Sequence, residues 1–87
     1  MKIKEGFVLR EVAGSFIVVA VGGMVKKFNG VINLNDSGAF LWKELVKGAT
    51  EEELVDKLTA EYDVDRETAK EDIKAFIGKI AEAGLID

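Results

Sequence analysis

The chain has 87 residues and a formal net charge of −4, and it contains neither cysteine nor histidine. Without these residue types it can build no disulfide framework, no thiol nucleophile and no imidazole base or metal ligand, so only carboxylates remain for catalysis. The length is that of one small domain, which we expect to span residues 1–87. So small a core leaves little room for a deep substrate cavity.

Charge is distributed unevenly along the chain. The first 35 residues carry five basic and two acidic side chains, whereas the remainder carries seven basic and fourteen acidic ones. Because an acidic surface is repelled by nucleic-acid phosphates and by anionic lipids, we expect neither nucleic acid nor a membrane as a partner. No uninterrupted apolar run approaches the length of a signal peptide or a membrane span, which predicts a cytoplasmic protein.

The N-terminal third has the composition of a β-hairpin. Runs rich in β-branched and aromatic residues at 7–12 and 15–21 flank Ala13-Gly14, a pattern typical of a two-residue turn. Strand alternation assigns one face of this hairpin to the core, and that face carries Phe7, Leu9, Phe16 and Val18. The other face is also largely apolar, which indicates a covering segment or a contact surface for a partner enzyme or a second copy of the chain: Val8, Ile17, Val19 and Val21.

Two further extended segments are expected before the first helix. Residues 24–28 resume an extended pattern after Gly22-Gly23, and Asn29-Gly30 is the strongest turn dipeptide in the chain. Val31–Leu34 then forms the last strand. Since nothing later in the sequence resembles a strand, this last strand should keep one unpaired edge.

From residue 37 onward the apolar residues recur at helical spacing. We expect a first helix over 37–47 capped by Asn35 or Asp36, and a second from the capping box at 50–53 to residue 61. A third, capped by Asp65, should extend to Ala83. The predicted fold is therefore α+β and winged-helix-like, with three to four short antiparallel strands followed by three helices.

The acidic residues do not form a pattern suited to catalysis or metal binding. Glu51, Glu52 and Glu53 fall in the first turn of a helix, where the macrodipole already favours them. We therefore expect no catalytic residue, no metal site and no cofactor. A winged-helix DNA-binding regulator is a weaker alternative, because the polar positions of the third helix are four acidic and three basic. A dimeric structural module is a second alternative.

Peptide binding is the function that the pattern favours. An unpaired strand offers amide and carbonyl groups to which an extended segment of another chain can add, and the flank of the third helix would form the second wall of a groove. As an alternative to a peptide contact, Phe76 is equally explained as a core residue, and Ala75 as a helix former on a solvent-exposed face. The predicted peptide contacts are Val31, Ile32, Asn33, Leu34, Ala69, Asp72, Ala75, Phe76 and Lys79.

The stretch 34–42, Leu-Asn-Asp-Ser-Gly-Ala-Phe-Leu-Trp, resembles the motif of the PqqD-like family, Leu-Asn-x-Thr/Ser-Gly-x-x-hydrophobic-Trp. The likeness extends to the acidic helix after Thr50, the connector 62–65 and the ending 82–86. The resemblance implies a domain that binds the leader segment of a ribosomally made precursor peptide as an added strand between the third strand and third helix. It also implies presentation of that peptide to a modifying enzyme, often a radical S-adenosylmethionine protein. For the founding member of the family, the product of this modification is pyrroloquinoline quinone. On this chain the two walls would be 31–34 and 65–83.

Overall fold

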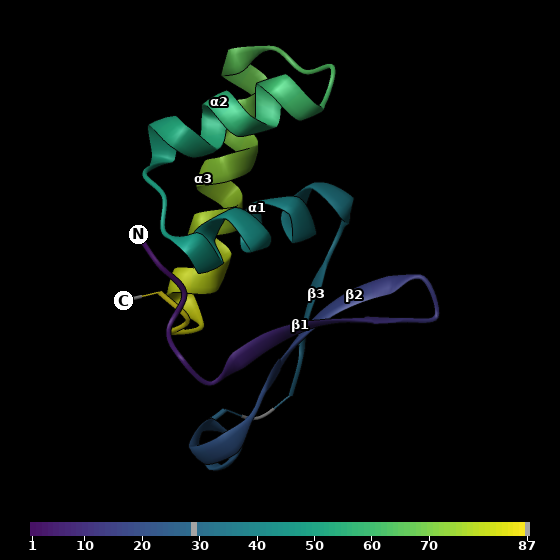
Figure 1. Ribbon diagram of the computed structural model, residues 1–87, viewed down its shortest axis with the longest axis vertical. Coiled ribbons are helices and arrows are strands. Elements are labelled where there is room, and N and C mark those ends of the chain that lie inside the picture. Colours follow the sequence, from purple (N-terminus) through teal and green to yellow (C-terminus); the bar gives the residue numbers. More distant parts are fainter. Residues whose placement is uncertain (29, 87) are drawn as a thin grey trace.

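The computed structural model describes residues 1–28 and 30–86, and its elements follow the predicted order. An antiparallel sheet is formed by β1 (Phe7–Val12), β2 (Ser15–Ala20) and β3 (Ile32–Leu34), in the spatial order β1-β2-β3. Three helices follow: α1 (Asp36–Lys47), α2 (Glu51–Glu61) and α3 (Arg66–Glu82). Figure 1 shows the sheet at one end of the molecule and α2 at the other. The predicted α+β class and the order of strands before helices are confirmed.

The hairpin of β1 and β2 has the predicted register. Ala13 and Gly14 both have positive φ angles, 52° and 80°, as a two-residue type I′ turn requires, and Val12 pairs with Ser15. The turn therefore sets every pair up to the one between Phe7 and Ala20. On the face that we assigned to the core, Phe7 and Val18 are buried, and Leu9 and Phe16 pack against the core cluster.

The predicted extended segment at Met24–Phe28 is wrong. Residues Gly22–Lys26 instead form a short 3-10 helix, η1, whose first residue, Gly22, has a left-handed φ of 60°. The turn brings Met24 against Gly6, where the space is too tight for a Cβ atom, and lets Phe28 pack edge-to-face on Phe7. Tertiary packing thus overrides the local alternation. The predicted turn at Asn29-Gly30 includes a residue outside the described ones.

Each helix begins at a capping side chain that the sequence indicated. Asn35 accepts a hydrogen bond from the Gly38 amide at 2.8 Å, so α1 begins at Asp36, one residue earlier than expected. Thr50 and Glu53 form the complete capping box of α2. Asp65 accepts from the Thr68 amide at 2.7 Å, and this backbone hydrogen bond lowers the pKa of the Asp65 carboxyl.

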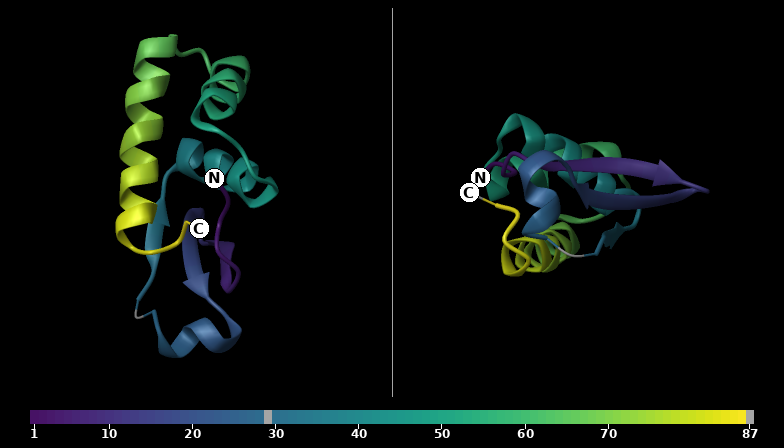
Figure 2. Two further views of the ribbon diagram at one scale, coloured as in Figure 1. Left: turned by 90° about the vertical axis from the view of Figure 1, so that its left-hand side faces the viewer. Right: turned by 90° about the horizontal axis from the view of Figure 1, so that it is seen from below.

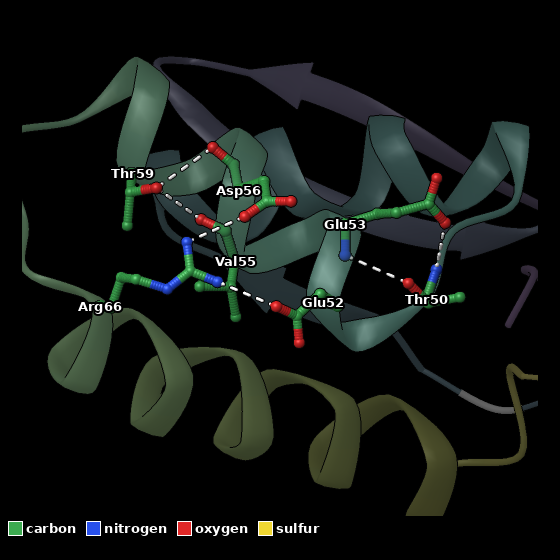
Figure 3. Close-up of polar contacts among 7 residues, drawn as sticks. All are labelled: Thr50, Glu52, Glu53, Val55, Asp56, Thr59 and Arg66. Atoms are coloured by element: carbon green, nitrogen blue, oxygen red, sulfur yellow. Dashed lines mark hydrogen bonds and ion pairs between the residues drawn. The ribbon is translucent and has the colours of Figure 1, made fainter.

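An arginine at the start of α3 connects that helix to α2. The Arg66 guanidinium donates to Asp56 at 2.8 Å and to Glu52 at 3.2 Å, as Figure 3 shows beside the capping box. Arg66 and Asp56 are both largely exposed, so we expect the contact to orient the two helices more than to stabilise them.

The core lies between the sheet and the three helices, with α1 in the middle. Trp42 is 2% exposed, and Leu54, Val55 and Leu58 of α2 are buried. The N-terminal and C-terminal segments pack together over the core. Leu85 is fully buried, and Ile86 forms a β-bridge with Ile3, a core residue that the sequence pattern did not single out. Within the described residues, no helix has the length and apolar character needed to cross a membrane.

Candidate binding groove beside β3

The hydrogen-bonding direction of each β2 residue follows from the hairpin turn. In a hairpin with a two-residue loop, the residues flanking the loop form a hydrogen-bonded pair, and bonded and non-bonded pairs then alternate. Val12 and Ser15 are such a flanking pair, and the same alternation predicts a bonded pair at Gly6 and Val21. The Val21 amide indeed donates to the Gly6 carbonyl at 2.8 Å. Alternate β2 residues, including Ile17, therefore direct their backbone groups toward β1.

This alternation places the backbone groups of Asn33 on the open edge of the sheet. Ile17 opposes Asn33, but the Ile17 backbone is bonded to β1, so this pair of β2 and β3 is a non-hydrogen-bonded one. The amide and carbonyl of Asn33 consequently face away from β2. Consistent with this direction, Lys79 Nζ on α3 donates to the Asn33 carbonyl oxygen at 2.8 Å. No described residue forms a strand pair on that side of β3.

A groove lies between this open edge and α3. Figure 2 shows β3 and α3 side by side and running in opposite directions. We call this surface the β3–α3 groove, and its lining comes from β3, the start of α1 and one flank of α3: Asn33, Leu34, Asn35, Ser37, Gly38, Leu41, Asp72, Ala75, Phe76 and Lys79. Asp72 and Lys79 are the two charged residues of this lining, and they lie two helical turns apart.

Six of the nine predicted peptide contacts line the groove: Asn33, Leu34, Asp72, Ala75, Phe76 and Lys79. The other three are placed differently. Val31 precedes β3 and is 53% exposed, whereas the side chain of Ile32 faces the core and Ala69 is completely buried between the helices. Phe76 unites the two interpretations given to it, because it is 7% exposed, belongs to the core cluster and still forms part of the groove wall.

The start of α1 contributes lining residues that the sequence identified only as a helix start and as part of the family motif. Asn35 Oδ1 accepts from Ser37 Oγ at 3.1 Å as well as from the Gly38 amide. A Cβ atom at Gly38 would lie 3.1 Å from Asn35 Oδ1 and 3.3 Å from Leu34 Cβ, so glycine lets α1 begin directly against β3. The motif at 34–42 that suggested the family therefore shapes the end of the groove. The spacing of this motif is the sequence signal that could have identified these lining residues.

A second cavity continues past the end of β3. It shares Asn33, Leu34, Asn35 and Ser37 with the groove and extends over the start of β2 to Tyr62. Tyr62 is held edge-to-face against Phe40, with the ring centroids 5.7 Å apart. An extended chain lying along β3 would run from the groove toward this aromatic pair.

The groove offers the groups that bind an extended polypeptide. It presents an outward amide and carbonyl on Asn33, apolar surface on Leu34 and Phe76, and one charge of each sign. Among residues 1–28 and 30–86 there is no group of three or more acidic residues placed to hold a metal ion. The outward backbone of Asn33 and the apolar wall of the groove favour recognition through main-chain hydrogen bonds and shape.

Comparison with known proteins agrees with this geometry. The family model described as "Coenzyme PQQ synthesis protein D (PqqD)" matches residues 7–86. The chain is similar to the solved structure "TbiB1 in Complex with the TbiA(beta) Leader Peptide", with 28% identity, a TM-score of 0.80 and coverage of 100% of this chain and 95% of the other. It shares the fold of "Lasso peptide synthetase B1 complexed with the leader peptide", at 21% identity and a TM-score of 0.76, over 97% and 93% of the two chains. The search of curated proteins returned no match. The family match spans nearly the whole sequence, and this chain therefore belongs to the PqqD family.

Proposed function

We propose that this protein is a noncatalytic adaptor that binds the leader segment of a ribosomally made precursor peptide and presents it to a modifying enzyme. The observation that carries the proposal is the outward-facing backbone of Asn33 beside a groove walled by α3. Support also comes from TbiB1, whose structure contains a leader peptide and resembles this chain over its full length. A radical S-adenosylmethionine enzyme in the cytoplasm is the proposed recipient.

In the proposed complex the leader adds as a fourth, antiparallel strand on the open side of β3. The leader residue opposite Asn33 exchanges two main-chain hydrogen bonds with it, which fixes the register of the added strand. The two neighbouring leader residues, opposite Ile32 and Leu34, then point to the core side of the sheet, where Leu34 and Phe76 line the groove. An apolar side chain on the leader residue opposite Leu34 would supply selectivity that main-chain bonds lack.

The outer face of the sheet is the proposed contact for the modifying enzyme. Val8, Ile17 and Val19 are half-buried there. The segment at 24–28 does not cover these three side chains, because its Phe28 packs on Phe7 at the opposite, core face of the sheet. A second copy of the chain is the alternative occupant. Analytical ultracentrifugation distinguishes the two, since a monomer at micromolar concentration excludes the homodimer.

A display selection tests the proposed function. The probe is a library of leader segments from ribosomally made precursor peptides, including the TbiA(β) leader, mixed with scrambled versions of each segment. We expect the wild-type domain to enrich leader segments over their scrambled counterparts. The Asn33→Pro variant, which lacks the outward amide, should lose that enrichment.

The matched control is a proline at the other edge of the sheet. Glu11 opposes Phe16 in a non-hydrogen-bonded pair of the hairpin, so its amide faces away from β2 on the β1 side. Glu11→Pro should keep the enrichment of leader segments. Equal enrichment on wild type and Asn33→Pro, or none on the wild type, would overturn the proposal.

A further inference from the structure

A lysine from α3 occupies the acceptor that a guest strand would use. Lys79 Nζ reaches the Asn33 carbonyl oxygen at 2.8 Å, across a separation of 46 residues in the sequence. That carbonyl belongs to the outward-facing residue at the centre of β3. In the free domain, the lysine ammonium therefore stands where the amide of a guest residue would donate its hydrogen.

A guest strand would force the Lys79 side chain to move. Paired strands lie about 4.8 Å apart, so the guest backbone would fill the space that Lys79 crosses to reach Asn33. The ammonium would then lose its carbonyl and some of its water. Covering a charge in this way is unfavourable unless a group of opposite charge pairs with it.

Among the described residues that line the groove, none is placed to pair with the displaced ammonium. Among residues 1–28 and 30–86, the ion pairs are those of Lys47 with Glu44 and of Arg66 with Glu52 and Asp56, and Lys79 takes part in none. Asp72 lines the same groove but lies seven residues earlier on α3, about 10 Å away along the helix axis. Glu82 lies three residues after Lys79 on α3 but outside the groove lining, so within the covered groove the partner comes from the guest.

We propose that Lys79 determines specificity in the groove: the guest strand displaces it from Asn33, and the released ammonium pairs with an aspartate or glutamate of the guest. This inference rests on the proposed function and names the class of leader that the groove selects. Because β3 and α3 run in opposite directions, Lys79 lies toward the Ile32 end of β3 and Asp72 toward the Asn35 end. The acidic side chain belongs on the guest residue opposite Ile32, next to the one bonded to Asn33.

The two parts of the proposal act in opposite directions when the lysine is removed. Lys79→Met leaves the Asn33 carbonyl free, so a guest without an acidic residue should bind as well as to wild type or up to about threefold more tightly. A guest with glutamate at the position opposite Ile32 should bind roughly two- to fivefold more weakly, as for other partly exposed ion pairs. A lysine that served only to support the fold would shift both affinities in the same direction.

A second selection tests the inference with a random dodecamer library as the probe. The baits are the wild type, Lys79→Glu and, as the matched charge control, Lys70→Glu, which changes an exposed α3 residue outside the groove lining. Peptides that also bind Asn33→Pro are removed. We expect one enriched acidic position on wild type and Lys70→Glu, and a basic residue at that position on Lys79→Glu.

Affinities for one enriched dodecamer and its Glu→Gln counterpart then give a quantitative check by fluorescence anisotropy. Opposite shifts on Lys79→Met support the inference. Equal weakening of both peptides, or the same acidic position on Lys79→Glu as on wild type, overturns it while leaving the proposed function intact. Failure of the wild type to retain any peptide after subtraction would count against strand addition itself, and with it the proposed function.

Discussion

Proline substitutions at two adjacent residues of β3 should have very different effects on stability. The Ile32 amide belongs to the hydrogen-bonded pair with Val18, and the Ile32 side chain is 9% exposed. Ile32→Pro therefore loses a ladder bond, worth about 1 kcal/mol, and much of a buried side chain, for which truncation costs about 2–5 kcal/mol. The Asn33 amide faces away from β2, and its exposed side chain contributes little packing.

We expect Asn33→Pro to lower the free energy of unfolding by no more than about 1 kcal/mol, since proline is tolerated at edge positions whose amide points outward. Ile32→Pro should lose about 3–5 kcal/mol, a large part of the roughly 4–13 kcal/mol expected for a chain of this length. Urea unfolding followed by the fluorescence of Trp42, which is 2% exposed, measures both variants. Equal losses for the two variants would refute the assignment of the open edge.

Four further variants test the supporting structure. Gly38→Ala should lower the free energy of unfolding by about 1–3 kcal/mol, because its Cβ would press on Asn35 and Leu34. A Cβ atom at Gly78 on α3 would meet nothing within 4 Å, so Gly78→Ala should raise the free energy of unfolding by about 0.5–1 kcal/mol. If urea unfolding showed both glycine variants shifting this free energy in the same direction, the packing at the start of α1 would be contradicted. Asp65→Asn should be less stable than wild type at pH 7. The lowered pKa of Asp65 means that its ionised carboxylate stabilises the fold above the ordinary carboxyl pKa, and this stabilisation is lost as the pH falls through the lowered pKa. A stability difference that persists in acid would show that the charge is not responsible. Arg66→Met should cost at most about 1 kcal/mol, less at high salt, and a larger or salt-independent loss in thermal unfolding would disprove a surface role.

Local sequence patterns predicted most of the fold. Ala13-Gly14 set the register of the hairpin, and Asn35, Thr50 and Asp65 marked the helix starts, because turns and caps depend on residues within a few positions of one another. The segment after Gly22 was mispredicted because Met24 and Phe28 take their positions from Gly6 and Phe7, which lie on another part of the chain.

The groove could be predicted in outline but not in detail. Sequence periodicity places Ala69 and Phe76 on the same side of α3, yet only the rotation of α3 against β3 leaves Ala69 buried and Phe76 on the groove wall. The contact between Lys79 and Asn33 joins two residues far apart in the chain, and no local pattern indicates it. The residues at the start of α1 were identified as a helix cap and as part of the family motif, and their part in the groove follows from the path of the chain between β3 and α1.

Amide hydrogen exchange at Asn33 tests strand addition most directly. The measurement uses the 15N-labelled domain, free and saturated with the leader segment most enriched in the display selection. We predict that exchange at the Asn33 amide slows at least about tenfold in the complex, because that amide gains a partner only when a guest strand is present. The amides of Ile32 and Leu34 are already bonded to β2 and should change little. Unchanged exchange at Asn33 in a saturated complex would contradict the account.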